Sequence, residues 1–295
     1  MSRPLKILLL IYLSVSAPVS AASGKAGEKV VVTSFYPVYI MALNVVGTAP
    51  NVSVQNLTPS LTGCLHDYSL TVNDMKKLAG ASLFITNGAG MEPFMKRIAA
   101  QRPNLKVVEL AKGIPLIRDE NGTPNPHVWT SVSNAIAEVR NLGKEMSEFD
   151  PGNAKLYRAN TNRYVAKLEA VRTRMQSELA AYRGRKVVTF HEAFPYFAQE
   201  FGLVIAAVIE REPGSQPSAQ ELARTIDLIK RHGIREIFSE PQYPASTAAT
   251  IAGETGARIY VLDPAVTGPD NPDAYLNIMK ANLAVLVSAL SPDHS

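Results

Sequence analysis

The stretch "RKVVTFHEAFPYFAQEFG" (residues 185–202) contains a strand pattern that runs directly into a helix pattern. Lys186 to Phe190 is a short run of mostly β-branched and aromatic residues, which predicts a buried strand. Apolar residues then recur at helical spacing as far as Gly202, which predicts a helix that ends at a glycine cap. His191 therefore lies at the carboxyl end of a strand, where open α/β sheets bind their ligands.

A similar unit stands earlier in the chain, in "EKVVVTSFYPVYIMALNVVG" (residues 28–47). It shares a basic residue, a valine run, a Thr, a Phe, an aromatic-rich helix and a terminal glycine with the first stretch. Strands are expected at residues 30–35, 52–57, 82–86, 105–110, 186–190, 204–209, 236–239 and 258–262, and helices at 37–46, 72–79, 92–100, 133–149, 193–201, 219–232, 246–254 and 273–290. This alternation predicts an α/β fold whose parallel strands are joined by helical crossovers, arranged as two related lobes.

The segment between the two units predicts one long helix. Its interior, within residues 151–184, has no Pro or Gly, and its apolar residues recur mostly three or four positions apart: Leu156, Tyr164, Leu168, Val171, Met175 and Leu179. About 30 helical residues span about 45 Å, which is longer than the core of one lobe needs. We therefore expect a signal peptide at residues 1–22, an N-terminal α/β lobe at 23–149, a bridging helix at 150–184 and a C-terminal α/β lobe at 185–295.

The first 22 residues have the pattern of a secretory leader. Arg3 and Lys6 are followed by an apolar run from Ile7 to Val15 and by small residues at a cleavage site near residue 22. The run is too short for a membrane span. Because no cysteine lies near the cleavage site, we expect a soluble periplasmic protein with a cleaved leader and no lipid anchor.

The overall charge excludes one class of partner. The formal net charge is +4 and falls to +2 once Arg3 and Lys6 leave with the leader. A balance this small gives no electrostatic footprint for nucleic acid. The single cysteine, Cys64, cannot form an intramolecular disulfide; we interpret it as an incidental thiol, with an unusual ligand or a reactive group as the alternative.

Three of the five histidines lie in similar surroundings: His66 in "CLHDY", His127 in "NPHVW" and His191 in "TFHEAF". Each precedes an aromatic residue within three positions. They stand 61 and 64 residues apart, which excludes a local zinc-finger or HExxH spacing. The three side chains can meet only if the two lobes face each other across a cleft.

A carboxylate is needed to complete a site with four donors. Glu240 and Asp263 are both candidates, because each ends a predicted strand of the second lobe. Three neutral imidazoles and one carboxylate suit a divalent first-row ion, of which zinc is the commonest. The aromatic neighbours Tyr68, Trp129 and Phe190 would exclude water and fix the orientation of the rings.

At this point the sequence resembles a known family, the metal-binding receptors of ABC transporters that import zinc, manganese or iron, also called cluster A-I or cluster 9. The resemblance covers nearly the whole chain after the leader. It rests on "VVTSFYPVY", "LHDYSLTVNDMKKLAGASLFITNGAGMEPF", "NPHVWTSVSNAI", "VVTFHEAFPYFAQEFGL", "PSAQELARTIDLIK", "IFSEPQY" and "ETGARIYVLDP". It implies two α/β lobes joined by one long rigid helix, with one divalent ion bound between them.

The resemblance also implies a ligand set. Carried over position by position, the ligands are His66, His127, His191 and Asp263, with Glu240 close by as the reserve carboxylate. Histidine at the third position favours Zn²⁺ as the transported ion, since relatives resembling manganese receptors commonly have glutamate there. Mn²⁺ or Fe²⁺ is the alternative cargo within the same family.

The sequence departs from the family pattern in two segments. "GCLHDYSLTVND" (residues 63–74) lacks the acidic residue and the prolines usual around the first ligand, and it contains Cys64, whose role stays open. The loop at residues 115–126 contains no histidine, which argues against a metal-gathering role for that loop.

We therefore expect a periplasmic receptor that captures a divalent ion, delivers it to an ABC transporter permease, works as a monomer and catalyses no reaction. Two other functions stay open on the residues alone. A secreted zinc hydrolase would use Glu192 or Glu240 as general base and would need an open coordination position. In an adhesion module the metal would be purely structural, and its removal would unfold the protein.

Overall fold

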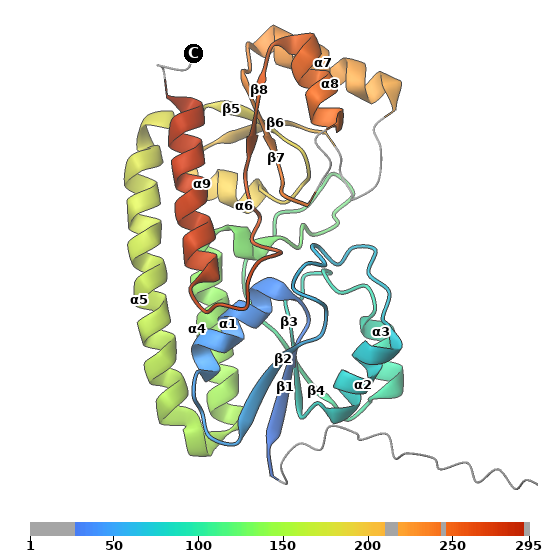
Figure 1. Cartoon of the computed structure of the whole chain (residues 1–295), viewed down its shortest axis with the longest axis vertical. Coiled ribbons are helices and arrows are strands. Elements are labelled where there is room, and N and C mark those ends of the chain that lie inside the picture. Colours follow the sequence, from blue (N-terminus) through green and yellow to red (C-terminus); the bar gives the residue numbers. More distant parts are fainter. Residues whose placement is uncertain (1–26, 210–217, 243–245, 292–295) are drawn as a thin grey trace, which may run out of the picture.

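The computed structural model describes residues 27–209, 218–242 and 246–291. The predicted signal peptide, residues 1–22, lies outside this part of the chain. The described residues form two four-stranded sheets with helices packed around them (Figure 1). The expected α/β class with two parallel-sheet lobes is confirmed.

The first sheet is entirely parallel. Its strands are β1 (Lys29–Thr33), β2 (Val52–Asn56), β3 (Leu83–Thr86) and β4 (Lys106–Glu109). Their order is β2-β1-β3-β4, so β1 is an interior strand. Because all four strands run the same way, their carboxyl ends meet at one edge of the sheet.

Several ends of the helices in the first half are marked by capping residues. They are α1 (Tyr36–Val46), α2 (Val72–Gly80), α3 (Met95–Gln101) and α4 (Val132–Phe149), with a 3₁₀ turn, η1 (Val128–Thr130), before α4. Thr71 and Asp74 form a capping box at the start of α2. Gly47 ends α1 with a φ of 55°, a conformation that favours glycine.

The second sheet repeats the plan of the first. Its strands are β5 (Lys186–Thr189), β6 (Val204–Val208), β7 (Glu236–Ser239) and β8 (Arg258–Val261). All pairs are parallel and the order is β6-β5-β7-β8, which matches β2-β1-β3-β4 strand for strand. The two lobes therefore share one topology, as the likeness between residues 28–47 and 185–202 predicted.

Capping residues also mark helix ends in the second half. They are α6 (Pro195–Phe201), α7 (Ala219–His232), α8 (Ser246–Thr255) and α9 (Ala274–Leu290). A capping box of Ser218 and Glu221 opens α7, and Gly233 closes it in the left-handed conformation. Gly202 closes α6 in the same way.

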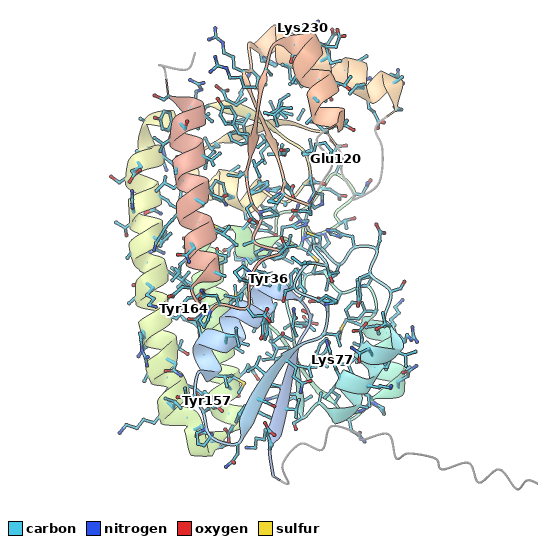
Figure 2. All side chains as sticks on the ribbon, viewed as in Figure 1. Tyr36, Lys77, Glu120, Tyr157, Tyr164 and Lys230 are labelled. Atoms are coloured by element: carbon cyan, nitrogen blue, oxygen red, sulfur yellow. The ribbon has the colours of Figure 1, made fainter. Side chains whose placement is uncertain are left out.

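The long helix α5 (Ala154–Leu179) has 26 residues and lies between two 3₁₀ turns, η2 (Pro151–Asn153) and η3 (Ala180–Tyr182). At about 1.5 Å per residue it is about 39 Å long, and it runs beside both lobes with α9 along its flank (Figure 1). The predicted apolar face is buried except for Leu156, which is half-buried; Tyr157 (labelled in Figure 2) and Val165 are buried in addition.

One hydrophobic core extends through both lobes. The largest cluster of buried apolar residues joins Val31 and Leu83 of the first sheet to Val187 and Phe238 of the second, with Leu286 of α9. A smaller cluster lies between the second sheet and helices α7 and α8. A shared core of this kind resists large movements of one lobe against the other. Within the described ranges, no helix combines the length and apolar character needed to cross a membrane.

Candidate metal centre

The predicted ligands lie on loops that end strands of the two sheets. His191 follows β5 within two residues, Glu240 follows β7 directly and Asp263 follows β8 within two residues. His66 lies in the loop between β2 and α2, and His127 directly precedes η1. Both lobes therefore contribute side chains, and the second lobe contributes them from the carboxyl edge of its sheet.

The three histidines predicted from the sequence come together. The ring centroids of His66 and His127 lie 5.0 Å apart, those of His66 and His191 5.7 Å, and those of His127 and His191 4.9 Å. His127 and His191 are buried, whereas His66 is half-buried. Three imidazoles from three distant segments thus lie close together between the lobes, although the donor atoms that lie within 4.8 Å of one another are those of Cys64, His66 and His127.

A neighbouring amide fixes the ring of His127. Nδ1 of His127 lies 3.0 Å from Oδ1 of Asn125, and Nδ2 of Asn125 donates to the backbone oxygen of Glu192 at 2.9 Å. Since the amide oxygen of Asn125 can only accept, Nδ1 of His127 carries the proton and Nε2 presents its lone pair. An orienting partner of this kind is typical of metal-ligating histidines.

Sequence reasoning did not single out Asn125. Its position two residues before His127 was the available signal, because an Asn side chain can accept from a backbone amide two residues on. That bond is present, from the backbone N–H of His127 to Oδ1 of Asn125 at 3.0 Å. Asn87 adds support by donating from Nδ2 to the backbone oxygen of Pro126 at 3.0 Å.

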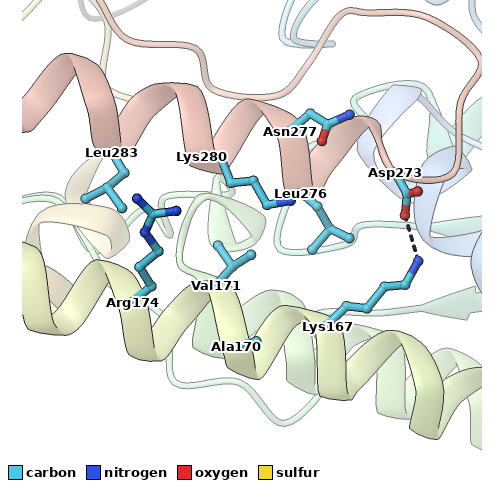
Figure 3. A pocket seen from close by; sticks show the side chains of 9 residues that line it. All are labelled: Lys167, Ala170, Val171, Arg174, Asp273, Leu276, Asn277, Lys280 and Leu283. Atoms are coloured by element: carbon cyan, nitrogen blue, oxygen red, sulfur yellow. Dashed lines mark hydrogen bonds and ion pairs between the residues drawn. The ribbon is translucent and has the colours of Figure 1, made fainter.

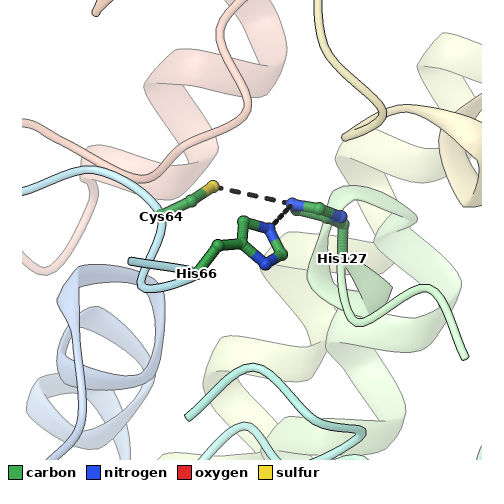
Figure 4. Close-up of side chains that lie close together, drawn as sticks. All are labelled: Cys64, His66 and His127. Carbon is green, nitrogen blue, oxygen red and sulfur yellow. Dashed lines mark hydrogen bonds between the residues drawn. The ribbon is translucent and has the colours of Figure 1, made fainter. Parts of the chain in front are cut away.

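Cys64 joins the predicted histidines. Nε2 of His127 lies 3.2 Å from Nε2 of His66 and 3.6 Å from Sγ of Cys64 (Figure 4). One donor atom from each of these residues lies within 4.8 Å of the other two. The sequence left the role of Cys64 open and favoured an incidental thiol, whereas the structure places its sulfur beside two candidate ligands.

These separations fit a shared metal ion. A tetrahedral zinc ion with bonds of about 2.0–2.1 Å to nitrogen and about 2.3 Å to sulfur holds two nitrogens about 3.3 Å apart and a nitrogen and a sulfur about 3.6 Å apart. The distances from Nε2 of His127 are 3.2 Å and 3.6 Å. Nitrogen and sulfur donors of this kind suit borderline-soft divalent ions.

The two candidate carboxylates have different surroundings. Glu240 is 2 % exposed; its Oε1 lies 3.6 Å from Nδ1 of His191, and its Oε2 accepts from Nε2 of Gln242 at 2.6 Å. Oδ1 of Asp263 accepts from the backbone N–H of Ala265 at 2.7 Å. Glu240 is thus in contact with a candidate ligand, while the assignment of Asp263 as the fourth ligand stays a prediction.

Burial keeps the imidazoles of His66 and His127 neutral. Burial, and then the charge of His191, lowers the pKa of His66 to about 4, although Asp67 partly opposes the shift. Burial, followed by the charges of His191 and His66, lowers the pKa of His127 well below its usual value. Neutral imidazoles have free lone pairs, so both rings can bind a metal ion at neutral pH without first losing a proton.

The pKa values of Cys64 and Asp263 are raised, whereas those of the two histidines are lowered. Burial, and then the charge of Glu240, raises the pKa of the Cys64 thiol well above its usual value. Burial also raises the pKa of Asp263, with Glu240 adding to the shift and the amide of Ala265 opposing it. A cation placed among these groups would reverse both shifts, because it stabilises the deprotonated forms.

The aromatic residues named from the sequence have distinct roles. The ring of Trp129 lies 5.3 Å from that of His127 and 5.0 Å from that of Phe35, and its Nε1 donates to the backbone oxygen of Pro264 at 2.7 Å. Trp129 therefore shields His127 as predicted. Tyr68 instead donates to Asp74 of α2, and Phe190 is buried in the smaller core.

A cavity of about 340 Å³ opens beside the histidines. It is lined by His66, Ile117, Arg118, Asp119, Thr123, Pro124, Asn125, Pro126, His127 and Glu192. A groove of about 390 Å³ lies elsewhere, between α5 and α9, where Lys167 pairs with Asp273 at 2.9 Å (Figure 3). No histidine or cysteine lines that groove, whereas His66 and His127 both line the cavity.

Comparison with known proteins agrees with this geometry. The family model described as zinc-uptake complex component A, periplasmic, matches residues 31–289. The high-affinity zinc uptake system protein ZnuA of Bacillus subtilis is 28% identical over 303 residues, covering 96% of this chain and 94% of that protein.

Solved structures are similar as well. The solute-binding protein FpvC of Pseudomonas aeruginosa, determined in complex with Ni²⁺ and with Mn²⁺, superposes with a TM-score of 0.81 at 31% identity; the Ni²⁺ complex covers 89% of this chain and 97% of its own. The laminin-binding protein Lmb of Streptococcus agalactiae, described as having adhesin and metal-transporting activity, gives a TM-score of 0.78 at 29% identity, covering 89% of this chain and all of its own (100%). The chain belongs to the ZnuA family, the periplasmic receptor components of zinc-uptake systems.

Proposed function

We propose that this protein captures one Zn²⁺ ion between its lobes and delivers it to an ABC transporter permease. His66, His127 and His191 would bind the ion together with a carboxylate, for which Asp263 is the first candidate and Glu240 the second. The observation that carries the proposal is the convergence of three imidazole rings, with centroids 4.9 to 5.7 Å apart, from three separate segments.

The surroundings of the cluster support capture of a bare ion. The buried ring of His127 is neutral, Asn125 orients it, and Trp129 shields it from solvent. Such a preorganised and partly dry site binds a cation tightly because little reordering is needed. Because the candidate ligands lie on both lobes, a permease that separates the lobes slightly would weaken several bonds together and release the ion.

Zinc is the proposed cargo because imidazole is a better donor for Zn²⁺ than for Mn²⁺. Mn²⁺ or Fe²⁺ is the alternative, and the FpvC structure solved with Mn²⁺ shows that a relative binds manganese. A secreted zinc hydrolase is the weaker alternative, since the family consists of solute-binding receptors. We further propose that the mature protein is a periplasmic monomer that has lost residues 1–22, carries no lipid anchor and catalyses no reaction.

Calorimetric titration of the metal-free mature protein with Zn²⁺ and, separately, with Mn²⁺ tests the proposal. One equivalent of Zn²⁺ should bind tightly, and Mn²⁺ should bind at least about tenfold more weakly. His191→Ala should lower zinc affinity by orders of magnitude, whereas His232→Ala, at an exposed histidine beside Lys186, should leave it unchanged. Equal affinity for both ions would change the cargo, and the absence of stoichiometric binding would contradict the proposed site.

A further inference from the structure

Cys64 stands where the sequence departs from the family pattern, in "GCLHDYSLTVND" (residues 63–74). We propose that Cys64 is a thiolate ligand of the captured ion and that it makes the site select thiophilic ions such as Zn²⁺ over Mn²⁺. The inference rests on the proposed function, because that function brings the ion to the site. In a four-coordinate site Cys64 takes one of the positions, so that one member of the histidine and carboxylate set implied by the family is left unbound.

The first support is the alignment of the donor atoms. Sγ of Cys64 and Nε2 of His66 lie 3.6 Å and 3.2 Å from Nε2 of His127, and Asn125 holds the ring of His127 so that this nitrogen presents its lone pair. A tetrahedral zinc ion shared by the three donors would set these distances at about 3.6 Å and about 3.3 Å. The thiol therefore needs little movement to become a ligand.

The second support is an independent acceptor directed toward the same cluster. Oε1 of Glu240 is buried and accepts no hydrogen bond from the described residues, and it lies 3.6 Å from Nδ1 of His191. Buried carboxylates are normally hydrogen-bonded or paired with a cation. An ion between the lobes would satisfy this carboxylate, and its charge is close enough to act on the Cys64 thiol.

Binding of the ion by the Cys64 sulfur requires loss of a proton but no oxidant. When the ion binds, the S–H bond of Cys64 breaks, its proton leaves to solvent and a sulfur lone pair forms the bond to the metal. One thiolate and one carboxylate then offset the two positive charges of the ion, which lowers the cost of burying it. Thiolate is a soft donor that Zn²⁺ accepts readily, whereas Mn²⁺ prefers oxygen, so the sulfur discriminates between the two ions.

A purely structural role would account for only part of these observations. Cys64 packs against the main hydrophobic core, as a small apolar residue can. Packing explains why the side chain is partly buried, but it does not require the sulfur to lie at a metal-ligand separation from Nε2 of His127. The two roles predict different behaviour when the sulfur is replaced by oxygen.

The first experiment compares Cys64→Ser and Cys64→Ala with the wild-type protein by competition titration against a chelator. Zinc affinity should fall roughly 10- to 100-fold in both variants, while Mn²⁺ affinity should change less than about threefold. Leu61→Ala is the matched control in the same loop, since Leu61 is 80 % exposed, and both affinities should stay unchanged. An unchanged ratio of zinc to manganese affinity in both cysteine variants would overturn the inference.

The second experiment gives its main result on the wild-type protein, so it does not depend on whether a variant folds. Co²⁺ bound to the wild-type protein should show a thiolate-to-cobalt charge-transfer band, and Cys64 is the only cysteine that can produce it. The band should be absent from Cys64→Ser. If Co²⁺ binds through the histidines without the band, Cys64 is not a ligand and the receptor function stands. If no divalent ion binds the wild-type protein, the proposed function itself fails.

Discussion

Two side chains besides the predicted ligands, Asn125 and Cys64, contact His127. The proximity of the three histidines was predictable because His191 follows a predicted strand and because three similar contexts recur along the chain, whereas their role as ligands stays a prediction. Asn125 acts on His127 through a hydrogen bond between two side chains. Cys64 lies beside His127 because of the conformation of the loop between β2 and α2. Neither interaction leaves a periodic pattern in the sequence, so both required the folded chain.

The choice between two carboxylates is a question for single substitutions. We expect Asp263→Ala to lower zinc affinity more than Glu240→Ala, by roughly 100-fold against roughly 10-fold, if Asp263 binds the ion and Glu240 acts from behind His191. Competition titration of the two variants measures both values. The reverse ranking would reassign the carboxylate to Glu240, whose contact with His191 provides a structural reason for that outcome.

Stability of the metal-free protein should depend on pH through the buried histidines. The pKa of His66 falls from 6.5 to about 4 because burial and His191 disfavour the charged ring. Between these values the unfolded chain binds a proton that the folded chain does not, so this contribution to stability is present above about pH 6.5 and is lost as the pH falls toward 4.

Urea unfolding of the metal-free protein at several pH values measures this effect. The free energy of unfolding should decrease from neutral pH toward about pH 4, and His66→Gln should flatten the decrease because glutamine does not titrate. His127 contributes in the same direction, so a smaller slope should remain. A His66→Gln slope equal to that of the wild-type protein would show that His66 titrates normally in the fold.

Among the elements, the carboxyl ends of helices were easier to predict than the carboxyl ends of strands. The bounds of α7 were predicted to the residue, because Ser218, Glu221 and Gly233 are local capping signals. Strands β1 and β5 end earlier than hydrophobicity suggested, since Phe35 and Phe190 are buried but lie beyond the last paired residues. Apolar patterns report burial rather than pairing, so they extend past the strand end where the chain turns toward the site.

Close packing between α4 and α5 depends on one glycine. A Cβ at Gly143 would overlap Oγ1 of Thr161 and lie 2.9 Å from its Cγ2. Gly143→Ala should therefore destabilise the protein by about 1–3 kcal/mol, despite the better helix propensity of alanine. The measurement is chemical unfolding of the metal-free protein.

Gly253 in α8 is the matched control for this element. A Cβ at this position would meet nothing within 4 Å, and the residue is exposed. Gly253→Ala should stabilise the protein by about 0.5–1 kcal/mol through helix propensity alone. If both variants change stability by the same amount, contact between α4 and α5 does not depend on the missing side chain at Gly143.

At the scale of the whole molecule, side chains fasten the segment after β8 to the first lobe. Tyr36 of α1 (labelled in Figure 2) donates to the backbone oxygen of Pro269 at 2.9 Å, and Asn44 of the same helix donates to that of Pro272 at 2.7 Å. The sequence predicted two lobes and a long helix, but these bonds join residues more than 200 positions apart and no local pattern reports them. The predicted division at residues 149 and 184 stays a prediction, and α9 packs against α5 and α1 as well as its own lobe.

More bonds tie α6 to the start of α4. The carboxylate of Glu200 accepts from the hydroxyls of Ser131 and Ser133 at 2.7 Å and 2.6 Å. Together with the shared core, these contacts should hold the lobes nearly fixed when the ion binds. Small-angle scattering of metal-free and zinc-loaded protein should therefore give radii of gyration that differ by less than about 1 Å.

Removing the hydrogen bonds from Tyr36 and Asn44 to the segment after β8 tests whether they hold the lobes in place. The double variant Tyr36→Phe with Asn44→Ala removes both donors from α1 without replacing a candidate ligand, so it should retain zinc binding. The difference in radius of gyration between its metal-free and zinc-loaded forms should be larger than in the wild-type protein. Lys106→Ala, which loses an exposed ion pair with Glu145 inside the first lobe, is the matched control and should behave like the wild-type protein. A wild-type difference of several ångströms would mean that the lobes close on the ion like a hinge, and that the core spanning both lobes rearranges on binding.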